Sequence, residues 1–412
     1  MNDSDHILDA TARRLALKEG YAVIFTNASK DTHNHNATFA DEISPELLSY
    51  GISVRCLDYI NDVRQVSEAL RDPHCLFFLC FNGFGSELKI SYAPGNLGSA
   101  FEYYQKPLFD LMHDCPIHET MAHQVGSTGQ YRKLLMTDYS YAHLARLLGV
   151  KNVHAVSSIT FPRTIGQTSL PLSARPIDVL LPVGLSSFHQ TRERYAAPKD
   201  YKERIFRQIF EGVTEYAVAN LEVDPLIQTL LAFQELQMPV NLQDAHVRFL
   251  FTSIVDYVKF ARRDQLVRSI QHLPITVIAD RDVREVYKNT NFRFLGAKSF
   301  PELVRTMGEA KSVICPLPHH TGFHERALAA FSAESVVIAA PNDILETNFV
   351  VGRDMITYSS VEQLATLLES VVEGRIELQS IASNGKRKAL DRFPPERIAD
   401  IIVSLWSSVS RH

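Results

Sequence analysis

The apolar positions along this chain form short β-branched and aromatic runs that alternate with stretches of helical periodicity. This alternation predicts parallel strands joined by helical crossovers. In the first part of the chain we expect six strands, at Tyr21–Phe25, Ile52–Tyr59 and Cys75–Phe81 and near Lys106, Lys133 and Asn152. Between the first two strands, the segment SPELLSYG predicts a helix that is capped by Ser44.

The pattern restarts at Arg175, where RPIDVLLPVGLSSF predicts a strand that opens into a Gly-Leu-Ser-Ser turn. Residues 198–273 carry apolar positions at three-to-four spacing almost throughout, which predicts a helical insert. Strands follow at 274–280, 292–296, 312–316, 335–340 and near Met355. We therefore expect an α/β protein with two Rossmann-like, doubly wound parallel-sheet domains that face a cleft, the second with a helical insert.

The same pattern predicts the domain boundaries. We expect residues 1–170 to form an N-terminal domain and residues 171–390 a C-terminal domain that contains the insert. Residues 391–412, which include Trp406, predict a helix that crosses back to the N-terminal domain. Because open parallel sheets bind ligands outside the carboxyl ends of their strands, this arrangement predicts a two-substrate site between the domains.

Composition and charge narrow the class of protein. The 412 residues exceed what one hydrophobic core usually serves. A net charge of −5 and a pI near 6.3 give no basic surface for nucleic acid, so we expect a small or protein partner. The five cysteines form no CxxC pair and the first residues resemble no secretory signal, which favours a reducing cytoplasm. The purest apolar run, Cys75–Phe81, is too short to span a membrane.

The segment Asn291–Asp343 carries the most specific motif. It has a strand that ends in Gly296, a helix, a strand that ends in Pro316, and then GFHER at residues 322–326 at the start of a helix. This order resembles the donor-binding segment of GT-B glycosyltransferases, especially the CgeB-like (spore maturation protein-like) branch of the glycosyltransferase family 1-like group. The resemblance implies that the donor substrate is a nucleotide sugar whose nucleoside diphosphate is UDP or GDP, with no cofactor and no bound metal.

The start of the helix in this motif is the predicted donor site. Gly322 and Phe323 precede a strong helix-forming run, so backbone N–H groups near His324 and Glu325 should be unpaired and attract a diphosphate. Arg326 and His324 would add charge-assisted hydrogen bonds and stabilise the departing nucleoside diphosphate. The alternative is that Arg326 is a solvated first-turn residue and that Glu325 merely complements the helix dipole.

Four other positions at strand ends are weaker candidates for contact with the donor. Gly184 and Ser186 follow the first strand of the second domain and can offer backbone N–H groups to a phosphate. Arg281 and Asn342 follow two later strands, and a surface position is the equal alternative for Arg281.

The donor motif also departs from the wider fold family. The common motif has two glutamates eight positions apart, but Thr321 and Ala329 occupy those positions here. Glu334 replaces the usual glycine before the following strand. Binding of the ribose by the customary carboxylate is therefore not carried over to this chain.

Three histidines in the same turn raise the alternative of a metal site. His319 and His320 are adjacent and diverge on most backbones, and His320 and His324 converge only on a helix. The nearby Pro318 and Gly322 disfavour a helix there. We therefore predict that no metal is bound.

If the transfer inverts configuration, the N-terminal domain must supply a base that takes a proton from the acceptor. LMHDCPIH follows a predicted strand and supplies His113, Asp114 and His118, of which Asp114 is the first choice and a turn aspartate its alternative role. Asp138 lies at the end of another predicted strand, where we expect it to cap the helix that follows. The segment Asn27–Phe39 offers Asn and His donors to an acceptor, or forms a solvated loop.

These observations together predict a bacterial-type cytoplasmic glycosyltransferase that moves a sugar from a nucleotide-sugar donor to an acceptor, either a protein, a glycan or a small molecule. A sugar-nucleotide epimerase of the same double-Rossmann plan and a non-catalytic nucleotide-sugar binding protein stay open as alternatives. A hydrolase with a nucleophile elbow is disfavoured because the chain has no Gly-x-Ser-x-Gly. The sequence leaves a homo-oligomer open.

Overall fold

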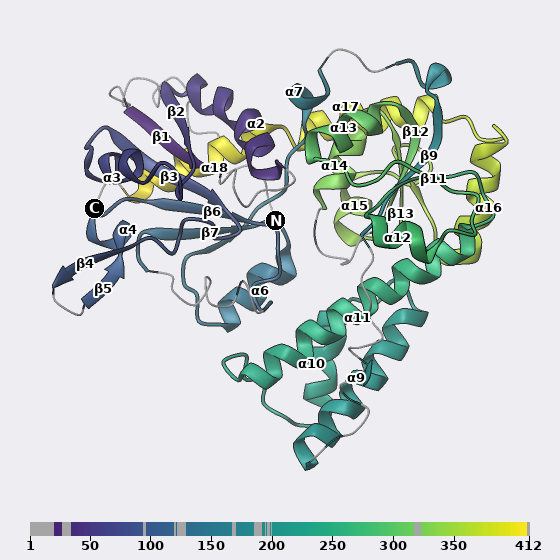
Figure 1. Ribbon diagram of the computed structural model, residues 1–412, viewed down its shortest axis with the longest axis horizontal. Coiled ribbons are helices and arrows are strands. Elements are labelled where there is room, and N and C mark those ends of the chain that lie inside the picture. Colours follow the sequence, from purple (N-terminus) through teal and green to yellow (C-terminus); the bar gives the residue numbers. More distant parts are fainter. Residues whose placement is uncertain are drawn as a thin grey trace.

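The computed structural model describes residues 20–26, 34–93, 96–118, 121, 129–166, 170–184, 192–193, 195, 198, 200–316, 322 and 324–409. Two six-stranded parallel sheets lie side by side, and a three-helix segment projects from the second half (Figure 1). The predicted fold class, α/β with two Rossmann-like domains and a helical insert in the second, is confirmed.

The first sheet has the strand order β2-β1-β3-β6-β7-β8. Its strands are β1 (Gly20–Phe25), β2 (Ile52–Leu57), β3 (Cys75–Phe81), β6 (Leu108–Met112), β7 (Arg132–Met136) and β8 (Val153–Ala155). Side chains alternate between two cores along β1, with Ala22 and Ile24 in one core and Tyr21, Val23 and Phe25 in the other. Because both faces of the strand are buried, its sequence is an unbroken apolar run.

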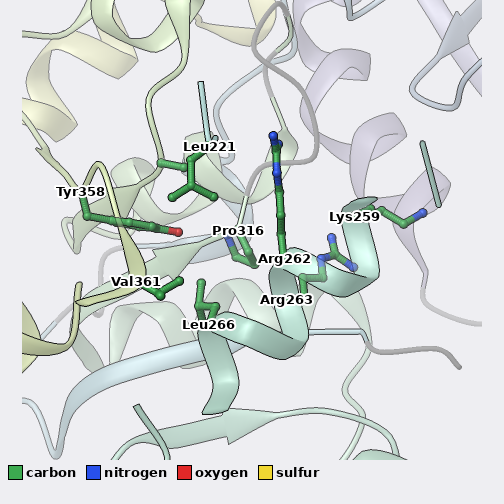
Figure 2. A pocket seen from close by; sticks show the side chains of 9 residues that line it. Leu221, Lys259, Arg262, Arg263, Leu266, Pro316, Tyr358 and Val361 are labelled. Atoms are coloured by element: carbon green, nitrogen blue, oxygen red, sulfur yellow. The ribbon is translucent and has the colours of Figure 1, made fainter. Parts of the chain in front are cut away.

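The second sheet has the strand order β11-β10-β9-β12-β13-β14. Its strands are β9 (Ile177–Pro182), β10 (Thr276–Ile278), β11 (Arg293–Phe294), β12 (Ala310–Cys315), β13 (Val336–Ala339) and β14 (Ile356–Thr357). The order reverses between β9 and β12, and sheets of this kind bind nucleotides outside the carboxyl ends of the strands at that point. A pocket opens beside these ends (Figure 2).

Helices connect the strands in both halves. The first half contains α2 (His35–Ser49), α3 (Val63–Arg71), α4 (Ala100–Tyr103), α6 (Tyr139–Leu147) and α7 (Pro162–Ile165), and a hairpin of β4 (Lys89–Ala93) and β5 (Asn96–Ser99) flanks its sheet. The second half contains the 3-10 turn η1 (Leu172–Ala174), α12 (Arg281–Val286), α13 (Phe300–Gly308), α14 (Glu325–Ser332), α15 (Asp343–Asn348), α16 (Val361–Val372) and α17 (Gln379–Arg392). No helix in the described ranges has both the length and the apolar character needed to cross a bilayer.

The insert consists of α9 (Tyr201–Ala219), α10 (Pro225–Glu235) and α11 (Ala245–Ile270). Each helix begins at an aspartate whose carboxylate accepts a backbone N–H of the first turn, namely Asp200, Asp224 and Asp244. The apolar core of the insert is continuous with the core beneath β6 and β7 of the first sheet. The insert therefore bridges the two halves.

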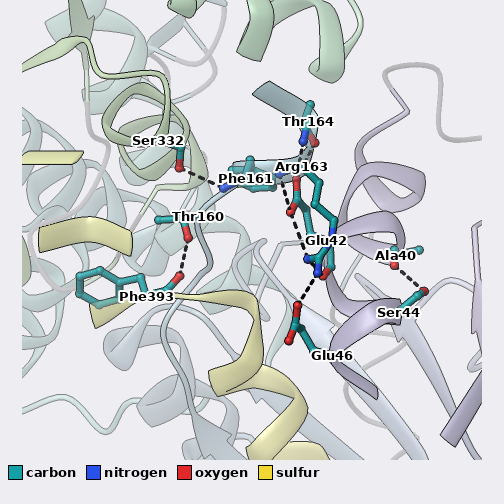
Figure 3. A network of polar contacts seen from close by, with 10 residues as sticks. All are labelled: Ala40, Glu42, Ser44, Glu46, Thr160, Phe161, Arg163, Thr164, Ser332 and Phe393. Carbon is teal, nitrogen blue, oxygen red and sulfur yellow. Dashed lines mark hydrogen bonds and ion pairs between the residues drawn. The ribbon is translucent and has the colours of Figure 1, made fainter. Parts of the chain in front are cut away.

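The chain crosses between the halves twice, and the two crossings are hydrogen-bonded to each other (Figure 3). Thr160 donates both its backbone N–H and its hydroxyl to the carbonyl of Phe393, at 2.8 and 2.9 Å. Beside them, the buried carboxylate of Glu42 accepts the backbone N–H groups of Arg163 and Thr164 at the start of α7. These bonds bring both connections between the halves to one point.

The last helix, α18 (Pro395–Val409), returns to the first half and packs against α2. Ile398 and Ile402 are buried in the same core as Phe39. The ring of Trp406 lies 6.4 Å from that of Phe77 on β3, centroid to centroid. The first half thus includes both ends of the described chain.

The predicted cap at Ser44 is wrong, because Ser44 lies inside α2. Its hydroxyl donates to the carbonyl of Ala40 at 2.6 Å, and the helix begins nine residues earlier at His35. The helix continues through Pro45, which lacks the backbone N–H of an ordinary residue. Packing of the buried face that includes Leu47 offsets that loss.

Candidate functional site

The carboxyl ends of the two sheets meet at Asp138 and Gly322. Asp138 follows β7, Gly322 follows β12, and the two form an antiparallel β-bridge between the halves. A Cβ atom at Gly322 would collide with the carboxylate of Asp138, so this approach requires glycine. Asn342 donates its side-chain amide to the carbonyl of Gly322 at 3.2 Å and also caps α15. Both Gly322 and Asn342 therefore hold this junction together.

Asp138 also caps α6, as the sequence predicts. Its carboxylate accepts the backbone N–H groups of Ser140 and Tyr141, at 2.7 and 3.3 Å.

His324 is the N-cap of α14, and one helix-start donor is already used. Its Nδ1 accepts the backbone N–H of Arg326 at 3.3 Å, whereas the sequence suggested that donors near this point are unpaired. The Glu325 carboxylate lies 3.2 Å from the same nitrogen. Burial lowers the pKa of His324 to about 4, against the opposing effect of Glu325, so the imidazole is neutral at neutral pH.

Glu325 keeps its carboxylate ionised. Burial raises its pKa, but His324, His35 and Arg326 outweigh that effect and hold the pKa at about 2. The start of α14 therefore presents a carboxylate beside a guanidinium group.

Two arginines meet at the point where the strand order of the second sheet reverses. Arg326 directs Nη1 to the carbonyl of Pro182 at 3.4 Å, and Arg263 on α11 donates Nη1 to the carbonyl of Gly184 at 2.9 Å. Arg263 is only 8% exposed, and its Nε has no partner among the described residues. Burial and the charge of Arg326 lower the pKa of Arg263 to about 9. A buried, incompletely paired cation next to a second cation is a site for an anion.

The pocket beside these arginines is partly open to solvent, and its empty space, with that solvent included, comes to about 430 Å³. Figure 2 shows Lys259, Arg262, Arg263 and Leu266 projecting from α11, with Tyr358 and Val361 across from them. Leu221, Pro316 and Ala340 complete the described lining. These lining residues include three cations and no carboxylate, so the pocket favours an anionic ligand.

Arg262 differs from its neighbour because three carbonyl groups hold its Nε and Nη2. Its guanidinium donates to the carbonyls of Ala217, Asn220 and Val223, at 2.6 to 3.0 Å. Arg262 thereby supplies hydrogen-bond donors to carbonyl groups at the C-terminal end of α9, which have no partner within the helix. Arg262 therefore braces the end of α9, whereas the buried Nε of Arg263 has no partner among the described residues.

His113 and Asp114 lie at the carboxyl end of β6, on the first half's side of the junction. Asn82 at the end of β3 accepts both of their backbone N–H groups through Oδ1, at 2.8 and 3.3 Å. Burial and the neighbouring His35 lower the pKa of His113 to about 3, and the charge of Glu325 on α14 opposes them. Asp114 has an exposed side chain, and partial desolvation together with Glu325 raises its pKa. The structure thus brings His113, Asp114 and Glu325 into one electrostatic group.

His118 faces the insert, and its charge also acts on Asp114. Its Nε2 is 3.9 Å from the carboxylate of Asp256 on α11, which also holds Lys259 at 2.8 Å. This contact joins the first half to the insert.

The remaining predicted positions are only partly described. The backbone of Gly184 follows β9, and its carbonyl accepts from Arg263. Arg281 begins α12 after β10, and its side chain lies outside the described residues, as do Ser186 and Phe323 and the histidines of the metal alternative, His319 and His320. Within the described part of the chain, no group of three or more His, Cys, Asp and Glu side chains is arranged to hold a metal ion.

Sequence reasoning missed Arg263 and did not single out His35. Arg263 lies on the buried face of α11 with Leu266 and Val267. A charged residue at a position that the helical periodicity assigns to the core is the signal that could have identified it. His35 is the first residue of α2, and its ring lies 5.2 Å from that of His113 and 4.8 Å from that of Phe300 on α13. Nothing local in the sequence marks that contact, because three separate elements create it.

The fold and this site define the class of protein. Two Rossmann-like domains with a site at their facing carboxyl ends form the GT-B fold of glycosyltransferases. Residues 262–404 match the family described as glycosyl transferase-like. The glycosyltransferase resemblance is therefore confirmed. No curated protein matches the chain in sequence.

Three solved structures have a similar fold. Alr3699/HepE from Anabaena in complex with UDP-glucose has a TM-score of 0.54 at 12% identity, covering 94% of this chain and 99% of that one. The sucrose-phosphate synthase tll1590 from Thermosynechococcus elongatus has a TM-score of 0.55 at 10% identity, covering 95% and 99%. The apo form of the lipopolysaccharide outer core galactosyltransferase WaaB has a TM-score of 0.50 at 12% identity, covering 94% and 99%. At these identities the likeness concerns the fold alone.

Proposed function

We propose that the protein transfers a sugar from a nucleotide-sugar donor in the second domain to an acceptor in the first. The observation that carries the proposal is a pair of arginines, Arg263 on α11 and Arg326 at the start of α14. They lie beside a cationic pocket at the point where the strand order of the second sheet reverses. A diphosphate fits there because it supplies the acceptor oxygens that the unused guanidinium donors lack.

In sugar transfer, these cations matter most at the step in which the donor loses its sugar. The bond between the anomeric carbon and the diphosphate oxygen breaks, and its electron pair stays on the diphosphate. Negative charge therefore grows next to Arg263 and Arg326, which stabilise it without metal. The oxygen of the acceptor hydroxyl bonds to the anomeric carbon from the side of His113 and Asp114, and the hydroxyl proton passes to the Asp114 carboxylate.

We assign the donor to the UDP-sugars. HepE, which shares the fold, is described in complex with UDP-glucose. The pocket residues Tyr358, Leu221 and Val361 offer an apolar and aromatic surface for a base next to the cations. We place the protein in the cytoplasm, because its five cysteines are all free. Free thiols persist in compartments where reductants are abundant. The acceptor is a protein or a glycan.

A panel of nucleotides tests the proposal. UDP, GDP, ADP and CMP, each with the matching sugar nucleotides, are titrated against the protein by thermal shift and calorimetry. We expect UDP and UDP-sugars to raise the melting temperature and the other bases to have little effect. UDP release from UDP-glucose, followed in time, separates the enzyme from a binding protein, and analysis of the sugar identifies an epimerase. A protein with no preference among the nucleotides would contradict the assignment.

A further inference from the structure

His113 has one ring nitrogen without a hydrogen-bond partner. Its Nε2 is buried and finds none among the described residues. We propose that Thr137 is a positioning residue that keeps the His113 proton on Nδ1, so that Nε2 offers a lone pair to a hydroxyl group of the acceptor substrate. The inference rests on the proposed function and adds to it the hydroxyl that the first domain recognises.

The Thr137 hydroxyl lies between two groups that compete for its single proton. Its oxygen is 3.2 Å from the carbonyl of Met112 and 3.3 Å from His113 Nδ1. When the proton goes to Met112, the oxygen becomes an acceptor, and Nδ1 must donate. The opposite arrangement places an N–H on the buried, unpartnered Nε2. Orphaned N–H groups are rarer in proteins than unpaired acceptors, which favours the first arrangement.

A buried network fixes the backbone beneath the ring. Asn82 accepts the His113 N–H at 2.8 Å, and Asn82 itself has φ of 48°, in the left-handed region. The next residue, Gly83, donates its N–H to the carboxylate of Asp110 at 2.9 Å. That carboxylate forms a buried ion pair with Arg132. The imidazole of His113 is therefore held at both its backbone and its Nδ1.

The surroundings of the ring keep it neutral. Phe39 and His35 lie 4.8 and 5.2 Å from it, centroid to centroid. Burial and the neighbouring His35 lower the pKa of His113 to about 3. A neutral imidazole with a free lone pair accepts a hydrogen bond and does not neutralise a phosphate. His113 therefore serves the hydroxyl side of the reaction, whereas Arg263 and Arg326 serve the diphosphate side.

The tautomer can be read without any substrate. Long-range proton–nitrogen correlation spectra of ¹⁵N-histidine-labelled protein distinguish a protonated from an unprotonated ring nitrogen. In the unmodified protein we expect a protonated Nδ1 and an unprotonated Nε2 for His113. Thr137→Val removes the acceptor for Nδ1, so the ring should shift to the other tautomer, whereas Thr137→Ser should keep it. Thr214→Val, a buried threonine in α9, is the matched control.

The kinetic arm uses UDP-glucose with water as the acceptor, measured as UDP release. Thr137→Val should lower kcat about tenfold, the worth of one hydrogen bond, and leave KM for UDP-glucose unchanged. Thr137→Ser should restore kcat. A protonated Nε2 in the unmodified protein, or an unchanged tautomer in Thr137→Val, would overturn the inference. Absence of UDP release would count against the proposed function alone, because the spectra need no turnover.

Discussion

Replacement of Arg263 by methionine should weaken donor binding without weakening the fold. Arg263 is buried, and among the described residues its guanidinium donates to the Gly184 carbonyl while its Nε has no partner. Its pKa falls from 12.5 to about 9, and this depression corresponds to a cost on the order of 5 kcal/mol for holding the charge in the folded state. The folded pKa lies below the unfolded one, so the cost is fully present below pH 9 and is lost as the pH rises toward 12.5.

The two effects of this substitution have opposite signs. Without ligand, methionine removes the cost of the charge and loses one hydrogen bond worth about 1.5 to 3 kcal/mol, so the melting temperature should stay level or rise. With UDP, the loss of phosphate contacts should weaken binding by about 2 kcal/mol, roughly thirtyfold in Kd.

Arg262→Met is the matched control for this measurement. Arg262 satisfies the carbonyls of Ala217, Asn220 and Val223, so its removal should lower the melting temperature. Calorimetry with UDP and thermal melts without ligand are run on both variants. If Arg263→Met melts as early as Arg262→Met and binds UDP like the unmodified protein, Arg263 is a structural residue and the reasoning fails.

Three further predictions follow from particular contacts. Gly322→Ala should lower UDP release from UDP-glucose by about 100-fold, because its Cβ displaces Asp138 and so separates the two sides of the site; an unchanged rate would show that this approach is not needed. The free energy of unfolding should fall as the pH drops below 6.5, by up to about 1.4 kcal/mol per pH unit for each of His113 and His324. Their pKa values in the folded protein, about 3 and 4, lie below the value of 6.5 in the unfolded chain, so the unfolded chain binds more protons in this range. Melting curves of His324→Asn between pH 4 and 6.5 that keep the same slope would refute this. Ala340→Leu narrows the pocket and should weaken UDP binding at least tenfold in calorimetry, whereas Ala399→Leu in the distant core should spare it.

The strands of both sheets follow from local sequence alone. Most residues in these strands are apolar, and each strand of the two sheets appears where the pattern predicts it, from Tyr21–Phe25 to the short strand near Met355. Helix starts were harder to predict, because α2 begins in a polar stretch that looks like a loop until His35 is seen against Phe300. Glu334, which stands where the resemblance leads us to expect glycine, has φ of 56°, a backbone conformation that favours glycine.

The site could be predicted only in part. The helix start at His324, with Arg326, carries its own motif, and the ends of β6 and β12 lie on the edges of the two sheets that face each other. Arg263 lies about 60 residues upstream of Arg326, on a different helix, and becomes a partner only through the topology. The Asp138 cap was predictable, but its contact with Gly322 was not, since nothing local joins two loops from different domains.

The return of α18 to the first half makes that half discontinuous in the chain. A fragment that stopped after α7 would lack Ile398 and Ile402, leaving the apolar face of α2 uncovered and prone to aggregation. Exchange of the first half between relatives must therefore transfer the terminal helix as well, because a chimaera that keeps only the first 166 residues would lack the residues that cover α2.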